Sequence, residues 1–352
     1  MSKHIERRPA RLGLMAGLLG ATLLAAPTAA LAQSKELTIA SFGGQLDEAF
    51  KKAMQPYLDK HGITVRWVPG TATENAAKVV ATKDSPEFDM VFLENITYDT
   101  VSRQDLLAKF DPEQMSNYAD LAPAAQVERR DGMPVGFFYT GIFYNPGEFE
   151  KRGWAAPTSW NDLFRPEFCN YIGVLNPSVS YGLHTVMMVG GGDPAKMDQG
   201  IERFAELGKC IATMEPSASK LEEKIQLGEY LVGAHGTIRV APLIDMNYPI
   251  RFTIPEEGSI LAFSVVTVPR NSPNLKLSQD VANWLVGPEA QKVFMDMAFY
   301  APVNTKVEQS PRLQEFGVPS GDQMDKIIRV DEALVVEKRR DWTRQVERAM
   351  TR

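Results

Sequence analysis

Residue patterns that support covalent catalysis or phosphate transfer are missing from this sequence. After residue 32 the histidines are His61, His184 and His235, and none belongs to a His-Glu-x-x-His motif. The sequence also lacks a Gly-x-Ser-x-Gly nucleophile motif and a Gly-x-x-x-x-Gly-Lys phosphate loop. We therefore expect no enzyme activity, no cofactor and no metal site. A hydrolase that uses two carboxylates is a lower-ranked alternative, because acidic residues are plentiful.

Residues that suit a small ligand instead follow the ends of the expected strands. Ligands of open α/β sheets bind beyond the carboxyl ends of the strands. Gly43 and Gly44 would let a ligand approach the backbone closely, or would only form a tight turn. Glu94 would hold a cationic group, or would cap the next helix. The candidates in this first part of the chain are Phe42, Gly43, Gly44, Thr71, Glu94 and Asn95.

A second group of candidates comes later in the chain and offers groups for both signs of charge. Ser178 and Ser180, with the amides of a helix start, suit a carboxylate or a phosphate, whereas Glu215 suits an amine. Aromatic rings can stack on a ring or a quaternary nitrogen, and we expect two of four to touch the ligand: Phe42, Tyr139, Tyr181 and Tyr300. The later candidates are Tyr139, Asn176, Ser178, Ser180, Tyr181, Glu215 and Tyr300.

Alternating strand and helix patterns would position the first group. Residues 37–41, 63–67 and 89–93 are apolar or β-branched runs that predict strands. Thr71 and Glu74 have the spacing of a capping box before a helix. One predicted helix face repeats every fourth residue, at Leu46, Phe50, Met54 and Leu58. The alternation predicts an α/β fold with a doubly wound, mostly parallel sheet.

The N-terminus predicts export. Four basic residues precede an apolar run at 12–26 and a small-residue site at 30–32, which is typical of a secretory signal peptide. A membrane anchor is the alternative, but roughly 15 apolar residues fall short of the about 20 that a span needs. Gln33 stands after the expected cut, so we expect a free periplasmic protein and not a lipoprotein. Arg7 and Arg8 leave twin-arginine export open beside the general secretory route.

Removal of residues 1–32 takes away four basic residues and one acidic residue, so the formal charge changes from −6 to −9. This charge disfavours a nucleic-acid partner. The remaining chain is longer than one hydrophobic core usually supports, which predicts two lobes. A long aromatic strand at 135–144 is interpreted as the outward crossing between them, and an apolar strand at 260–268 as the return.

The two cysteines of the sequence, Cys169 and Cys210, each lie just ahead of an expected strand. These strands, at 171–175 and 211–214, are expected to be parallel neighbours joined by a helix. Because an exported protein meets an oxidising compartment, we expect the two thiols to form a disulfide. Two separate buried thiols are the alternative.

Six motifs in a fixed order resemble the periplasmic solute-binding proteins of ABC importers, in the branch with spermidine/putrescine-, thiamine- and ferric-ion-binding members. The resemblance implies a two-lobed type II periplasmic-binding-protein fold with hinge strands between the lobes. It places lobe 1 at 33–135 and 264–322, lobe 2 at 136–263, and C-terminal helices that pack across the lobes at 323–352. The motifs start at Ala40, Pro157, Gly233, Ile260, Trp284 and Tyr300.

The resemblance also implies that the lobes close on a small solute and deliver it to an inner-membrane permease with its ATPase. A monomer is expected. His235 lies where polyamine-binding relatives carry a stacking aromatic residue, and Ser264 lies where they carry an acidic one. The missing acidic residue departs from the pattern of classical polyamine binders, so the expected solute is described more broadly as amine-bearing or zwitterionic and polyamine-like. Thiamine or thiamine phosphate is the alternative, and a ligand-sensing module for a receptor or an exported hydrolase ranks lower.

Overall fold

The structure is a computed structural model that describes residues 35–319 and 326–350, except for the side chains of Gln45, Ser180 and Glu332. The described residues form one compact unit. The expected signal peptide, residues 1–32, lies outside the described residues and stays a prediction.

The first half of the sheet contains three parallel strands. β1 (Lys35–Ser41) pairs with β2 (Ile63–Pro69) on one side and with β3 (Met90–Glu94) on the other. All three of the strands predicted in this part of the chain are present. Because the strands are parallel, their carboxyl ends meet at one edge of the sheet, where the first group of candidate residues lies.

Helices α1 (Gly44–His61), α2 (Ala72–Ala81) and α3 (Asn95–Ser102) follow these strands. α2 begins at the predicted capping box, in which the Thr71 hydroxyl accepts from the Glu74 amide at 3.1 Å and the Glu74 carboxylate accepts from the Thr71 amide at 2.8 Å. The predicted face of α1 is buried against the sheet, with core residues Leu46, Phe50, Met54 and Leu58.

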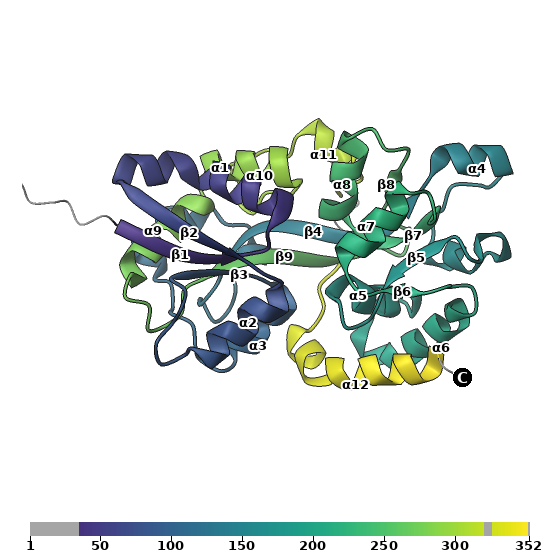
Figure 1. The fold of residues 1–352 in the computed structure, drawn as a ribbon, viewed down its shortest axis with the longest axis horizontal. Coiled ribbons are helices and arrows are strands. Elements are labelled where there is room, and N and C mark those ends of the chain that lie inside the picture. Colours follow the sequence, from purple (N-terminus) through teal and green to yellow (C-terminus); the bar gives the residue numbers. More distant parts are fainter. Residues whose placement is uncertain (1–34, 320–325, 351–352) are drawn as a thin grey trace, which may run out of the picture. The chain divides into compact units, whose positions relative to one another are not determined.

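Two strands run between the first half and the second half of the sheet (Figure 1). β4 (Met133–Tyr144) and β9 (Ser259–Thr267) pair with each other in antiparallel register. β9 also pairs with β3, and β4 pairs with β7 (Val232–Gly236). One continuous sheet of order β2-β1-β3-β9-β4-β7-β5-β6 results.

The second half of the sheet is built on β5 (Ile172–Leu175), which lies parallel to β6 (Met214–Glu215) and to β7. The predicted strand at 211–214 was wrong in extent, because regular pairing begins only at Met214. Asn170, just before β5, adopts a left-handed φ of 69° and bonds its amide to the Cys210 carbonyl, so the chain turns before the strands start. β8 (Arg251–Thr253) pairs with β4.

The helices of this half follow its strands as an α/β fold requires. They are α4 (Pro146–Arg152), α5 (Ser180–Val189), α6 (Met197–Gly208), α7 (Ala218–Gln226) and α8 (Thr237–Asp245). Single 3-10 turns occur at Pro112–Gln114, Tyr118–Asp120, Pro123–Ala125, Trp160–Phe164, Pro166–Phe168 and Pro194–Lys196.

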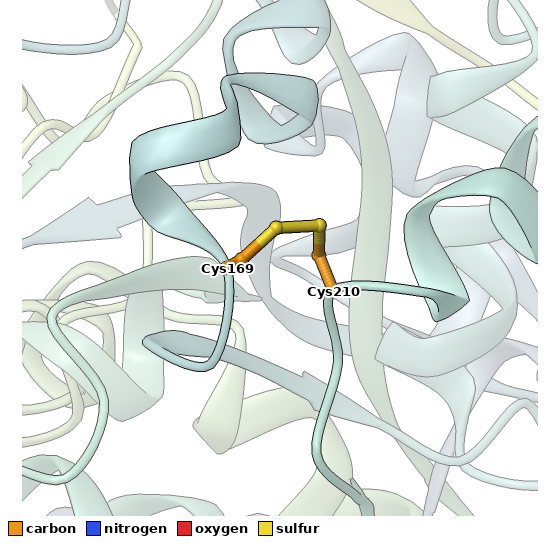
Figure 2. Close-up of a disulfide and its surroundings, with 2 residues drawn as sticks. All are labelled: Cys169 and Cys210. Atoms are coloured by element: carbon orange, nitrogen blue, oxygen red, sulfur yellow. A yellow bond between two sulfur atoms is a disulfide. The ribbon is translucent and has the colours of Figure 1, made fainter.

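Cys169 and Cys210 are joined by a disulfide (Figure 2). The bridge connects the turn before β5 with the segment that leads from α6 to β6. It therefore closes a loop around α5 and α6, with 41 residues of sequence separation between the two cysteines.

The C-terminal part returns to the first half and then to the second. α9 (Leu275–Leu285) and α10 (Pro288–Ala298) lie beside α1, and α11 (Pro311–Glu315) follows. We expected only polar helices from residue 323 onward, but Ile327–Ile328 form strand β10 on β9, because two apolar β-branched residues suit a sheet edge better than an exposed helix. One helix, α12 (Glu332–Met350), then closes the described chain.

A buried histidine on α5 predicts a pH dependence of stability. His184 is fully buried, its Nδ1 lies 2.9 Å from the Thr140 hydroxyl of β4, and burial lowers its pKa to about 4. In the unfolded chain the pKa of a histidine is about 6.5, so below that pH the unfolded state binds the proton first.

We expect the free energy of unfolding to fall by about 2 kcal/mol through His184 between pH 8 and pH 5. Urea denaturation of the wild-type protein and the His184→Gln variant at both pH values measures this contribution. The exposed residue His61, replaced in the same way, is the control. Equal pH dependence in the wild-type protein and His184→Gln would contradict the prediction.

Candidate functional site

A cavity of about 760 Å³ lies at the carboxyl ends of β1, β2 and β3 and at the loops that follow β5 and β6. Helices α8, α10 and α12 complete its walls. Among the sequence-predicted residues, those that line it are Phe42, Gly43, Gly44, Thr71, Glu94, Ser178 and Tyr181. The side chain of Ser180 lies outside the described part. The cavity thus draws on both halves of the sheet.

The turn after β1 needs its two glycines. Gly43 and Gly44 have φ angles of 73° and 62°, a left-handed conformation that side chains strongly disfavour. Asp47 holds the turn, because its carboxylate accepts from the Gly43 amide and from the Ser41 hydroxyl, each at 2.8 Å. The tight turn and the exposure of backbone to the cavity are therefore the same feature.

Glu94 serves the helix that follows β3 and also faces the cavity. It forms a capping box with Thr97 at the start of α3, and both residues line the cavity. The helix cap is therefore present, whereas the binding of a cationic group by Glu94 stays a prediction. Burial raises the pKa of the Tyr181 and Tyr300 hydroxyls, and the negative charge of Glu94 raises both pKa values further.

The start of α5 presents backbone amides and a buried hydroxyl. The residue before the helix is Val179, whose side chain cannot accept a hydrogen bond from the first amides. The loop before it is fixed by Asn176, whose side-chain oxygen accepts from the Ser178 amide at 2.8 Å. Tyr181 is 2% exposed, and its hydroxyl faces Arg239 but forms no hydrogen bond of normal geometry among the described residues. Such a hydroxyl beside the first amides of a helix suits an anionic oxygen.

Arg239 on the first turn of α8 is a cavity residue that the sequence analysis missed. One of its guanidinium nitrogens lies 3.7 Å from the Glu222 carboxylate of α7, and its buried Nε has no hydrogen-bond partner among the described residues. Burial lowers the pKa of Arg239, but Tyr181, Glu222 and Glu94 outweigh burial and raise it overall. The sequence could have indicated Arg239, because it lies just after the end of a strand, as the predicted site residues do.

His235 does not line the cavity but lies directly behind it. Its ring packs edge-on against Tyr181 at 5.3 Å, and its Nε2 lies 3.6 Å from the Glu222 carboxylate. Burial lowers the pKa of His235, whereas Glu222 opposes this shift, and the ring is fully buried. A side chain in this position supports Tyr181 and Glu222 rather than stacking on a ligand.

Other candidates lie outside the cavity lining, and the reason differs between them. Glu215 was expected to meet an amine, but its carboxylate accepts from the Tyr230 hydroxyl at 2.5 Å and pairs with Lys224 at 3.0 Å. Ser264 and Tyr300 bond to each other at 2.6 Å inside the core. The candidates that do not line the cavity are Asn95, Tyr139, Asn176, Glu215, His235, Ser264 and Tyr300.

Two of the four aromatic candidates, Phe42 and Tyr181, line the cavity. Tyr181, Tyr139 and Tyr300 all belong to one buried hydrophobic cluster, but Tyr139 and Tyr300 do not reach the cavity lining. Within residues 35–319 and 326–350, no cluster of three metal-binding side chains is found. The helices of the same part of the chain lack the length and apolar character needed to cross a membrane.

Comparison with known proteins gives three kinds of similarity. Residues 48–316 match the sequence profile described as bacterial extracellular solute-binding protein. A spermidine/putrescine-binding periplasmic protein from Haemophilus influenzae is 21% identical over 63% of this chain, and the match spans less than two thirds of that relative, 63%. A Salmonella typhimurium protein named for 2-aminoethylphosphonate binding is 26% identical over 75% of this chain and 74% of that relative. The solved spermidine/putrescine ABC transporter substrate-binding protein of Streptococcus pneumoniae has a TM-score of 0.74 at 16% identity and covers 90% of this chain and 100% of its own.

Proposed function

Since the chain belongs to the family of bacterial extracellular solute-binding proteins, we propose that its cavity captures a small zwitterionic solute for an ABC importer. The solute would pass to an inner-membrane permease with its ATPase. The fold class is the predicted one, the two-lobed type II fold of periplasmic binding proteins. We place lobe 1 at 33–135 and 264–322 and lobe 2 at 136–263, with β4 and β9 as the hinge strands of a monomer in the periplasm.

The proposal of a zwitterionic solute rests on one observation, which is that side chains of both charges lie on the cavity wall. Glu94 lies at the end of β3, and Arg239 lies on α8 beside the start of α5. An amine placed near Glu94 and an acid placed near Arg239, the Tyr181 hydroxyl and the α5 amides would each meet an opposite charge. A solute with one amine and one acidic group matches this wall.

A polyamine would fit the same wall poorly. Two further acidic side chains line the cavity, but Glu74 caps α2 and Glu222 lies beside Arg239 and His235. A dication would therefore place one ammonium group near a guanidinium, and a charge without compensation is costly in a closed cavity. Of the solutes in the relatives' names, 2-aminoethylphosphonate is thus the best match.

A thermal-shift comparison of the purified protein tests this proposal. The solutes are 2-aminoethylphosphonate, β-alanine, putrescine and thiamine, and a true ligand at 100 times its dissociation constant adds about 2.7 kcal/mol to stability. We expect at least one of the two zwitterions, 2-aminoethylphosphonate or β-alanine, to stabilise the protein, and we expect no stabilisation by putrescine. Stabilisation by putrescine alone would indicate that the solute is a polyamine. Stabilisation by thiamine alone would favour a solute that stacks on Phe42 and Tyr181.

A further inference from the structure

The C-terminal helix α12 packs on helices from both halves of the molecule. It lies along α6 of the second half and also contacts α3 of the first half (Figure 1, yellow). Val335, Trp342 and Val346 anchor it, and they share one hydrophobic cluster with Ile96 of α3. The helix therefore has a fixed position relative to the cavity wall that α3 and α5 form.

Arg339 of α12 lines the cavity. Its guanidinium donates to the Ser178 carbonyl at 3.2 Å, and Thr343, one turn later, donates to the Pro177 carbonyl at 3.5 Å. Both contacts hold the loop directly before the α5 amides. The guanidinium is thus placed at the same helix start that Tyr181 and Arg239 flank from α5 and α8.

The charge of Arg339 is poorly compensated where it lies. None of the ion pairs within 4.0 Å among the described residues includes it. Burial and the neighbouring Arg340 lower the pKa of Arg339, and Glu94 opposes them. A half-buried guanidinium without a carboxylate partner gains more from an arriving anion than a paired one does.

We propose that Arg339 supplies a second cation to the anion subsite and thereby selects a doubly charged phosphonate or phosphate group over a singly charged acid. This inference rests on the proposed function, because it assigns the acidic group of the zwitterion to the start of α5. One guanidinium balances a carboxylate or a sulfonate. Two guanidinium groups that line the same cavity, Arg239 from α8 and Arg339 from α12, together balance a dianion.

Three small solutes distinguish the effect of the charge of the acidic group from the effect of its shape. 2-Aminoethylphosphonate and taurine share the aminoethyl arm and a tetrahedral acid, but at pH 8 the phosphonate carries two charges and the sulfonate carries one. β-Alanine has the same arm and a planar acid with one charge. Isothermal titration of the wild-type protein at pH 8 should show about tenfold or greater preference for 2-aminoethylphosphonate over both other probes.

The Arg339→Gln variant should lose about tenfold in affinity for 2-aminoethylphosphonate, while its affinity for taurine changes by less than about threefold. Arg339→Lys should retain part of the preference, because the charge remains. Arg344→Gln is the matched control, since Arg344 is exposed on the same helix and does not line the cavity. A melting temperature without ligand that equals the wild-type value shows that each variant is folded. If Arg339→Gln is not folded, the test uses Arg339→Lys, which should show a smaller preference for 2-aminoethylphosphonate than the wild-type protein does.

Three failures of the experiment have different meanings. If the wild-type protein binds these probes and Arg339→Gln keeps the wild-type preference, the role of Arg339 is wrong and the proposed function stands. If the wild-type protein prefers taurine or β-alanine, selection of a dianion is wrong. If the wild-type protein binds none of the three, the zwitterion proposal fails, and this inference fails with it.

Discussion

Replacing Arg239 with glutamine is expected to weaken the binding of 2-aminoethylphosphonate by about 100-fold or more. This loss corresponds to about 3 kcal/mol, within the range for removing one partner of a desolvated charge pair. Arg239 lies beside the start of α5, and its Nε has no hydrogen-bond partner among the described residues. Glutamine keeps a hydrogen-bond donor but removes the charge, so the acidic group of the solute would lose its main counter-charge.

Titration calorimetry with the wild-type protein, Arg239→Gln and Arg251→Gln measures this loss. Arg251 is an exposed arginine on β8 that does not line the cavity, so its replacement should leave affinity unchanged. The comparison is valid if all three proteins melt at similar temperatures without ligand. An Arg239→Gln variant with affinity within about threefold of the wild-type value would remove Arg239 from the anion subsite.

Replacing Cys169 and Cys210 together by alanine is expected to lower the free energy of unfolding by about 4 kcal/mol. The bridge closes a loop with a sequence separation of 41 residues, and a loop of this length restricts the unfolded chain strongly. The effect should be confined to stability, since neither cysteine lines the cavity. Guanidinium denaturation of the oxidised wild-type protein and the double variant measures the difference.

The reduced wild-type protein is the control for this experiment. Reduction removes the covalent bond and keeps both residues, so its stability should match that of the double variant within about 1 kcal/mol. If the oxidised protein is no more stable than the reduced one, the bridge contributes nothing to stability. If only the double variant is less stable, packing of the cysteine side chains and not the bond is responsible.

Much of the fold could be predicted because local patterns agree with the tertiary structure. The capping box at Thr71 and Glu74 forms as its spacing predicts, and the apolar run at 89–93 becomes a buried strand. Prediction fails where a distant partner decides. Regular pairing of β6 starts only at Met214, because the chain turns at Asn170 before β5 begins, and Ile327 leaves the helical pattern to pair with β9.

The candidate site could be predicted in part, through the rule that ligands lie beyond strand ends. This rule places Phe42, Glu94 and Tyr181 at the cavity. It misleads for Tyr300, which bonds to Ser264 in the core, and for Glu215, whose carboxylate pairs with Lys224. A strand-end pattern does not show which partners such side chains find in the fold. Arg339 could not be found by the rule, because it comes from a helix more than 150 residues after the loop that it contacts, at a sequence separation of 161.

The disulfide has a practical consequence for chemical labelling. Because the sequence has two cysteines and both belong to the bridge, the oxidised protein offers no thiol to a maleimide. Met246 lines the cavity and is 55% exposed. A Met246→Cys variant would carry a single reactive thiol there, so one environment-sensitive dye could report solute capture as a change in fluorescence while the native bridge stays intact.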